Sequence, residues 1–323
     1  MAALDAEHHI DPGPDLVTAE LHRVGPREPV EGVVRSNEIC TASGKAASFV
    51  RHIEIDVGGT PLARSFVAGQ SFGVHPPGEN ERGRPHALRL YSLASPTRGE
   101  DGEGGVIATT VKRLIDERSD GPGLFTGVAS NYLCDLRPGD RLRVSGPNGK
   151  RFVLPARPEE HDYVFFATGT GIAPFRGMVL ELLERAPESR IALVMGAPYA
   201  TDLLYDGAMR ALDAEHANFS YLPTVSRQPQ RDGAGPMYVQ DRLEHDADLL
   251  GEILRSDRGL IYVCGLLGME LGIAQRLARR FAGDALERYL RIDPEVADDI
   301  DGWTRKMIHR KVKPTRRMFV EVY

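Results

Sequence analysis

A glycine-rich turn between an expected strand and an expected helix constrains this chain more than any other feature. The segment 163–167 is apolar and strand-like, and the run GTGIAPF at 169–175 leads into a helical pattern over 175–185. Such a turn presents backbone N–H groups and the positive end of a helix to an anion. Its two glycines allow close approach of a pyrophosphate, Thr170 can donate a hydrogen bond, and Pro174 suits a helix start. The turn therefore suggests a dinucleotide site without saying which dinucleotide. An ordinary strand-to-helix turn is the alternative, because the segment matches neither GxGxxG nor the P-loop.

Beyond position 155 the sequence alternates between apolar runs and helical patterns. We expect strands over 163–167, 190–196, 219–225 and 260–264, and helices over 175–185, 206–215, 239–254 and 267–281. This alternation predicts a doubly wound parallel sheet with helices on both faces. Ligands of such sheets bind beyond the carboxyl ends of the strands, so we expect contacts from the 169–175 turn, from 224–227 and from 264–266.

Between positions 21 and 155 the pattern is that of a β domain. Short alternating runs occur at 49–57, 88–93, 105–114 and 141–145, separated by turns rich in glycine and proline. The lack of long helices between them predicts an antiparallel barrel or sandwich. We therefore expect a flexible tail over 1–20, a β domain over 21–155 and an α/β domain over 156–323, with a linker at 156–161.

Composition limits the classes of protein that this chain can be. A formal net charge of −6 over 323 residues argues against general nucleic-acid binding. Cys40, Cys134 and Cys264 form no CxxC pair, so a disulfide scaffold is not expected and an iron–sulfur cluster would belong to a separate protein. We expect no metal site and no membrane span, since the sequence lacks an apolar run of about 18 residues. A cytoplasmic monomer is the prediction.

The string RLYS at 89–92 carries chemistry within the β domain. Arg89 can hold a phosphate, Tyr91 can cover the face of a flat ring, and Ser92 can bond a nitrogen at the ring edge. Together they predict a flavin clamp, although each alone is an ordinary strand or surface residue. Further along, VKRL at 111–114 closes another expected strand. Ser130 is expected near the start of a short helix, where free N–H groups could bind a second phosphate oxygen.

At this point the chain resembles the plant and cyanobacterial branch of the ferredoxin–NADP⁺ reductase family over roughly 21–323. The motifs that carry the resemblance are RLYS at 89–92, VKRL at 111–114, SNYLCDLRPGD at 130–140, GTGIAPFRG at 169–177, VSR at 225–227, MYVQ at 237–240, VCGLLGME at 263–270 and EVY at 321–323. The family implies an antiparallel barrel that binds FAD, followed by a doubly wound NADP-binding domain. It fixes the chemistry better than the physiological partner.

The resemblance also implies roles for individual residues. Arg89 and Ser130 would bind the FAD pyrophosphate, while Tyr91 stacks on one flavin face. Tyr323 would cover the other face as a gate that the nicotinamide displaces. The catalytic residues it implies are Ser92 near flavin N5, Cys264 beside the nicotinamide, Glu321 as a proton-relay or positioning carboxylate, and Tyr323. The cofactor-binding residues it implies are Arg89, Leu90, Tyr91, Ser92, Val111, Lys112, Val128, Ala129, Ser130, Thr170, Gly171, Pro174, Ser226, Arg227, Tyr238, Gln240, Gly265, Leu266, Glu270 and Tyr323.

Two departures from the family pattern concern the nucleotides. Ser226, Arg227 and Tyr238 favour NADP(H), because they can bind a 2′-phosphate and an adenine. The lysine often found two positions before that tyrosine is Pro236 here, so we expect weaker discrimination against NAD(H), with Arg231 as a substitute. The family usually has a tyrosine two residues after VKRL, whereas this chain has Asp116, which leaves the FAD adenine without its stacking partner.

The implied activity is hydride exchange with NADP(H) and single-electron exchange with a ferredoxin- or flavodoxin-like protein. The reductase component of an oxygenase and a noncatalytic flavin-bound regulatory or assembly subunit remain alternatives. An acidic partner could dock on basic residues, or these residues could form solvated faces. The candidates are Arg82, Arg84, Arg89, Lys112, Arg113, Arg137, Lys150 and Arg151, and a second cluster of Lys306, Arg310, Lys311, Lys313, Arg316 and Arg317.

Overall fold

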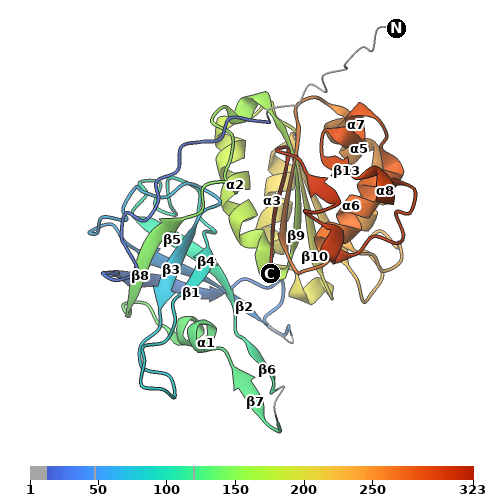
Figure 1. Cartoon of the computed structure of the whole chain (residues 1–323). Coiled ribbons are helices and arrows are strands. Elements are labelled where there is room, and N and C mark those ends of the chain that lie inside the picture. Colours follow the sequence, from blue (N-terminus) through green and yellow to red (C-terminus); the bar gives the residue numbers. More distant parts are fainter. Residues whose placement is uncertain (1–12, 47–48, 119–120) are drawn as a thin grey trace, which may run out of the picture.

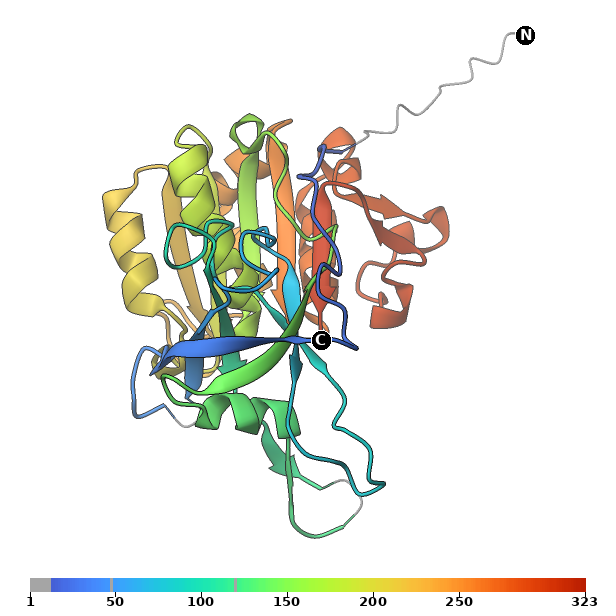
Figure 2. The same cartoon turned by 90° about the vertical axis from the view of Figure 1, so that its left-hand side faces the viewer.

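The chain folds into a β-barrel and an α/β sheet that meet where the chain ends (Figures 1 and 2). The computed structural model describes residues 13–46, 49–118 and 121–323. The predicted two-domain architecture is confirmed. Among the described helices, none has the length and apolar character needed to cross a membrane.

The barrel is a six-stranded antiparallel sheet in the order β4-β3-β8-β1-β2-β5. Its strands are β1 (Val30–Ile39), β2 (Val50–Asp56), β3 (Ser71–His75), β4 (Arg89–Ser92), β5 (Val106–Lys112) and β8 (Arg141–Asn148). The two edges meet just after β4, where Leu93 pairs with Thr109 and the Ala94 N–H donates to the Ala108 carbonyl at 2.7 Å. This contact closes the sheet around a core that includes Ile53 and Phe72.

Two short elements extend from the barrel toward the bottom of Figure 1. Strands β6 (Ile115–Glu117) and β7 (Leu124–Thr126) form a hairpin in which Asp116 lies opposite Phe125. The helix expected around Ser130 is α1 (Val128–Asp135), whose Leu133 and Cys134 pack against the barrel core. The residues of the VKRL motif therefore join the barrel strand β5 to the hairpin.

The second domain is a five-stranded parallel sheet in the order β11-β10-β9-β12-β15. Its strands are β9 (Asp162–Thr168), β10 (Ile191–Ala197), β11 (Phe219–Val225), β12 (Gly259–Gly265) and β15 (Met318–Val322). Helices α2 (Ile172–Arg185) and α3 (Asp206–Glu215) cover one face, while α5 (Ala247–Arg255) and α6 (Met269–Arg280) cover the other (Figure 1). Alternate residues of β9 point to the two faces, because Phe165 packs with the first pair of helices and Phe166 with the second.

Some predicted elements differ in detail. The helix expected over 239–254 is divided into η4 (Val239–Asp241), α4 (Arg242–His245) and α5, because Asp246 leaves helical geometry with φ −106° and ψ 43°. The helix expected from 267 begins at Met269, after Gly268 with φ 101°. Short elements not predicted from the sequence are η1 (Pro158–Glu160), η2 (Gly169–Gly171), η3 (Ala200–Asp202), α7 (Asp284–Glu287), β13 (Leu290–Ile292), α8 (Pro294–Ala297), η5 (Arg305–Met307) and β14 (Val312–Pro314).

The first described residues do not behave as the free tail expected over 1–20. The Val17 N–H donates to the Leu154 carbonyl at 3.1 Å, and the Ala156 N–H donates to the Asp15 carbonyl at 2.8 Å. Residues 13–20 therefore pair with the connection between the two domains, which supplies acceptors and donors that sequence patterns do not reveal. Residues 1–12 of the expected tail lie outside the described residues.

Candidate functional site

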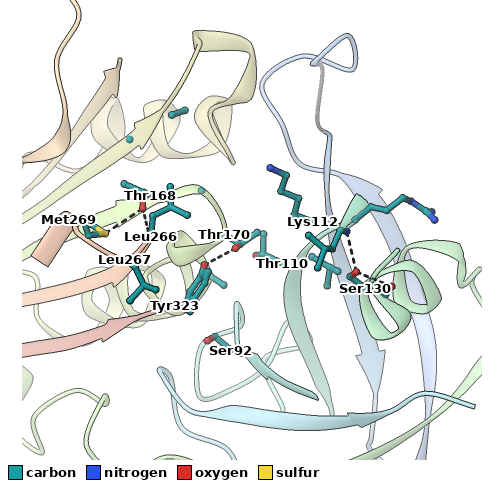
Figure 3. A pocket seen from close by; sticks show the side chains of 18 of the residues that line it. Ser92, Thr110, Lys112, Ser130, Thr168, Thr170, Leu266, Leu267, Met269 and Tyr323 are labelled. Atoms are coloured by element: carbon teal, nitrogen blue, oxygen red, sulfur yellow. Dashed lines mark hydrogen bonds between the residues drawn. The ribbon is translucent and has the colours of Figure 1, made fainter. Parts of the chain in front are cut away.

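A large cavity lies between the barrel and the parallel sheet (Figure 3). Its volume is about 1780 Å³. Single-ligand pockets commonly measure roughly 300–1,000 Å³, so this cavity has room for more than one small molecule. The barrel contributes β4, the end of β5, the hairpin and the start of α1, and the parallel sheet contributes the loops after β9, β10, β11 and β12.

The barrel wall presents charged and aromatic side chains. Arg89 is exposed, and its guanidinium donates to the backbone carbonyls of Ala87 at 3.5 Å and Leu88 at 3.1 Å. Tyr91 is half-buried beside it, and burial raises the pKa of the Tyr91 hydroxyl to about 12. Lys112 is exposed on the neighbouring wall. This wall therefore combines two cations with a neutral phenol, a set suited to a phosphate and a flat ring.

Helix α1 directs its amino end at the same wall. Among the described residues, no side chain caps this helix and its first turn holds no acidic residue. The Ser130 hydroxyl accepts a hydrogen bond from the Leu114 N–H at 3.1 Å and lies 3.3 Å from the Gly127 carbonyl. Ser130 thus orders the entry to the helix, and the uncapped backbone N–H groups at Val128 and Ala129 are positioned for an anion.

The opposite wall owes its shape to closely packed backbone. A methyl group added to Gly171 would come within 2.2 Å of the Cys264 carbonyl oxygen, and one added to Gly265, at φ 143°, within 2.2 Å of the Thr168 hydroxyl. Thr168 accepts a hydrogen bond from the Leu266 N–H at 2.8 Å (Figure 3). The loops after β9 and β12 are therefore fixed against each other, with Thr168, Thr170 and Leu266 facing the cavity.

The far end of this wall is formed by the loop after β11. Ser226, Arg227, Tyr238 and Gln240 all line the cavity. The buried Gln230 amide holds the loop, since its oxygen accepts from the Val225 N–H at 3.0 Å and its nitrogen donates to the Val225 carbonyl at 2.7 Å. Arg231, the expected substitute for the missing lysine, is exposed and is not among the lining residues.

The terminal tyrosine stands between the two walls. Strand β15 carries the chain to the cavity, where the Tyr323 N–H donates to the Gly265 carbonyl at 3.0 Å and the Leu267 N–H donates to the Tyr323 carbonyl at 3.2 Å. The hydroxyls of Tyr323 and Thr170 are 2.7 Å apart (Figure 3). The residue remains 57% exposed. The last residue is therefore anchored through its backbone while its ring faces the cavity.

Cys264 and Glu321 lie opposite each other in the ladder between β12 and β15. Cys264 is buried, and burial together with Glu321 raises the pKa of its thiol. Although Glu321 keeps solvent-exposed surface, the protein packed around its carboxyl raises the pKa of this group to about 7. Neither residue belongs to the lining of the cavity, although Cys264 directly precedes the β12 loop and Glu321 lies two residues before Tyr323.

The structure brings most of the predicted residues to one cavity. Those that line it are Arg89, Leu90, Tyr91, Ser92, Val111, Lys112, Val128, Ala129, Ser130, Thr170, Ser226, Arg227, Tyr238, Gln240, Leu266 and Tyr323. Those that do not are Gly171, Pro174, Cys264, Gly265, Glu270 and Glu321. Glu270 instead accepts a hydrogen bond from the Gly268 N–H at 2.7 Å and lies 3.4 Å from the Arg305 guanidinium.

Sequence reasoning missed several lining residues. Phe49 and Phe125, which are 40% and 52% exposed, line the cavity from the barrel domain, and Thr110 and Thr168 line it as well. Thr168 carried a signal, because it directly precedes the glycine-rich turn. The place of Phe125 at the cavity follows only from its pairing with Asp116, and that pairing depends on the register of the hairpin.

The two basic clusters are divided by the fold. Arg89, Lys112 and Arg113 line the cavity, and Arg113 pairs with Asp135 at 2.5 Å. In the second cluster, Lys306 lies on η5, whose Arg305 contacts the first turn of α6 next to the cavity. The Arg317 carbonyl instead binds the Ile261 N–H near the amino end of β12, at the end of the sheet opposite the cavity. Closeness to the terminal tyrosine in sequence is therefore not closeness in space for the whole cluster.

Comparisons with known proteins agree with this geometry. Residues 165–275 match the family model described as the oxidoreductase NAD-binding domain. The chain is 35% identical to a ferredoxin–NADP reductase of Spirulina sp over 259 residues, which cover 78% of this chain and 87% of the relative. It is 35% identical to the same-named protein of Thermosynechococcus vestitus over 78% of this chain and 66% of the relative.

A solved structure shares the fold. It is the ferredoxin–NADP⁺ reductase from Plasmodium falciparum, with a TM-score of 0.67 and 19% sequence identity over 96% of this chain and 100% of that chain. The likeness covers both the barrel and the parallel sheet. With the sequence identity to the Spirulina relative, it shows that this chain belongs to the ferredoxin–NADP reductase family.

Proposed function

We propose that this chain is an FAD-dependent oxidoreductase that exchanges hydride with NADP(H) and single electrons with a ferredoxin-like protein. The observation that carries the proposal is a cavity with a separate anion-binding set on each wall. Arg89 and the amino end of α1 serve one wall, while Ser226 and Arg227 serve the other. Tyr323 lies between them, where two flat rings would have to meet.

The residues present fit FAD on the barrel wall. The exposed Arg89 guanidinium and the uncapped α1 suit a pyrophosphate, and Tyr91 offers an aromatic face. When bound, FAD would supply both the hydride chemistry and the single-electron chemistry. Ser92, at the end of β4, would orient the ring edge.

Phe125 offers a replacement for the aromatic residue that the family usually has at the position of Asp116. The two residues are directly opposite each other on the β6–β7 hairpin, and both line the cavity. An aromatic ring on β7 can cover the same region of the cavity as one on β6. We assign Phe125 to the FAD adenine on this basis.

NADP(H) is the proposed nucleotide, and NAD(H) is expected to bind more weakly. Ser226, Arg227 and Tyr238 line the cavity where a 2′-phosphate would be recognised, which supports the preference. The ferredoxin–NADP⁺ reductase from Plasmodium falciparum has been solved with 2′P-AMP. Because Pro236 and Arg231 do not add a charge to this lining, discrimination between the two nucleotides would rest chiefly on Arg227.

Glu321, Cys264 and Tyr323 would hold a proton near the site and position the nicotinamide ring. Glu321, with its pKa raised to about 7, can hold or release a proton near neutral pH two residues before Tyr323. Cys264, kept as a thiol by burial, would pack beneath the nicotinamide. Tyr323 would leave its place against Thr170 to admit that ring. A monomeric state and a cytoplasmic location stay predictions.

The test is NADPH-driven reduction of a plant-type [2Fe–2S] ferredoxin by the purified, FAD-loaded protein. We expect both ferredoxin and an artificial dye to be reduced. Reduction of the dye but not of any ferredoxin would favour an oxygenase reductase component with a dedicated partner. Reduction of neither acceptor by protein that retains FAD would favour a noncatalytic flavin-bound subunit and contradict the proposal.

A further inference from the structure

A largely buried group of polar side chains joins the two domains outside the cofactor-binding residues named above. We call it the interdomain network, and its members are His52, Glu100 and Thr110 from the barrel domain and Arg176 and Tyr205 from the α/β domain. Polar groups that are removed from water are costly unless they are paired, so their arrangement demands a reason.

Tyr205 occupies the centre of this network. Its hydroxyl lies 2.9 Å from His52 Nδ1 and 2.6 Å from the Thr110 hydroxyl. His52 and Thr110 are opposite each other in the ladder between β2 and β5, so Tyr205 bonds two neighbouring barrel strands at once. Burial, with Arg176, lowers the pKa of His52 to about 3, and the imidazole is therefore neutral at ordinary pH.

The backbone at Tyr205 is held in an unusual conformation. Its φ of 55° is left-handed, which is uncommon and unfavourable for a residue with a side chain. The Tyr205 N–H donates to the Cys40 carbonyl of the barrel domain at 2.8 Å. Both the backbone and the hydroxyl of this residue thus bind the other domain, which explains how the strained conformation persists.

Arg176 makes the second connection. Its guanidinium forms a two-pronged ion pair with Glu100, at 2.6 and 3.1 Å, and donates to the Ala94 carbonyl at 2.8 Å. It also lies 5.4 Å from the centre of the Tyr205 ring. The carboxylates of Glu54 and Glu100 approach His52 closely enough to suggest a cation site, but Arg176 already neutralises Glu100.

The network touches both halves of the site through short stretches of chain. Thr110 lines the cavity and directly precedes Val111 and Lys112. Ala94 comes two residues after Ser92, and Arg176 directly follows the glycine-rich turn 169–175. A shift of this network would therefore move the flavin-side strands relative to the nucleotide-side loop.

We propose that Tyr205 is a positioning residue whose hydroxyl, through Thr110, sets the spacing between the flavin wall and the nicotinamide wall. This inference rests on the proposed function, because spacing matters only if a hydride passes between the two walls. Misplacement of reacting groups by about 1 Å can slow a reaction about 100-fold, so a network that holds two domains in register can govern the rate. Binding of each nucleotide would depend on it far less.

The test compares Tyr205→Phe with Tyr199→Phe, an exposed tyrosine in the same β10–α3 connection. Tyr205→Phe keeps the ring beside Arg176 and removes only the hydroxyl. We expect the rate of flavin reduction by NADPH, followed by rapid mixing, to fall about tenfold. FAD content and the NADPH dissociation constant should stay within about twofold of the unaltered protein, and Tyr199→Phe should change nothing. An unchanged reduction rate in Tyr205→Phe would overturn the proposal.

A coupled pair of variants separates positioning from general stability. Thr110→Val should slow flavin reduction as Tyr205→Phe does, Thr110→Ser should restore it, and the double variant should be no slower than either single one. Additive losses would overturn the proposal. Hydrogen exchange at β5 should also be faster in Tyr205→Phe than in the unaltered protein. If the unaltered protein binds FAD but no nicotinamide nucleotide, the proposed function fails. If the unaltered protein is reduced by NADPH and the variants are reduced at the same rate, this inference alone fails.

Discussion

The two walls of the cavity are built in different ways. The barrel wall relies on side chains that project from strand ends, such as Arg89 and Lys112. The α/β wall relies on backbone shape, with Gly171 and Gly265 pressed against neighbouring loops. Loss of a side chain should therefore weaken binding on the barrel wall without affecting the fold, whereas a methyl group added at Gly171 or Gly265 should disturb the α/β wall locally.

Removing Arg89 should give the largest effect on binding. Charged hydrogen bonds to a phosphate are worth up to about 3 kcal/mol, so Arg89→Ala should raise the FAD dissociation constant about 100-fold. Fluorescence titration of apoprotein with FAD measures this constant. Arg82→Ala, which removes an exposed arginine of the same domain outside the cavity, is the matched control. Equal affinities in the two variants would contradict the assignment.

Gly171→Ala tests the other wall. The added methyl would lie 2.2 Å from the Cys264 carbonyl, and overpacking of this kind costs about 1–3 kcal/mol of unfolding free energy. We expect weaker NADPH binding with FAD affinity retained, measured by calorimetry and by denaturant unfolding. Gly207 has open space around it, so Gly207→Ala should leave the affinities for NADPH and FAD unchanged. Loss of FAD together with NADPH would break the comparison between the walls.

Glu321 should impose a pH dependence. With its pKa raised to about 7, the carboxyl is protonated below pH 7 and ionised above it. If this proton is required, turnover with ferredoxin should fall as the pH rises through about 7. Glu321→Gln cannot titrate, and its profile should lose this limb while its rate is lower throughout. A limb that persists in Glu321→Gln would assign the titration to another group.

Tyr323→Ser should open the boundary between the walls. Because the ring would no longer have to be displaced from Thr170, we expect tighter nicotinamide binding and a smaller preference for NADP(H) over NAD(H). Difference spectra with NADP⁺ and NAD⁺ measure both constants. Unchanged affinities for both nucleotides would count against a gate.

The smallest expected effect concerns partner docking. Lys306→Glu, beside the cavity end of α6, should raise the KM for ferredoxin a few-fold at low salt, since a rim charge acts mainly on association. Arg316 precedes Arg317, whose carbonyl accepts a hydrogen bond from the Ile261 N–H near the amino end of β12. Arg316→Glu should therefore raise the KM for ferredoxin much less. Dye reduction should be unaffected in both. Equal effects of the two substitutions on the ferredoxin KM would refute the division of the cluster.

Patterns along the sequence predicted what local periodicity and turn chemistry can encode. The strands around Phe165 and Ile191 and the glycine-rich turn were found because apolar runs and glycines report local geometry. The break of the helix at Asp246 and the pairing of residues 13–20 with the interdomain connection depend on tertiary partners. Strand β15 was likewise absent from the predicted strands, although it directly precedes Tyr323.

The site shows the same division. The side chains of Arg89, Ser226 and Arg227 belong to recognisable motifs and do line the cavity. Phe125 and Tyr205 do not, because the role of each depends on a residue far away or on the opposite strand. The 306–317 cluster lies just before the terminal tyrosine in sequence, yet the fold places Lys306 near the cavity and Arg317 at the opposite end of the sheet.

The most direct test of a flavin wall facing a nicotinamide wall is an anaerobic titration of the FAD-loaded protein with NADPH, followed through flavin absorbance and repeated with NADH. We expect NADPH to bleach the bound flavin at a lower concentration than NADH does. Protein that binds FAD but is bleached by neither nucleotide would contradict it.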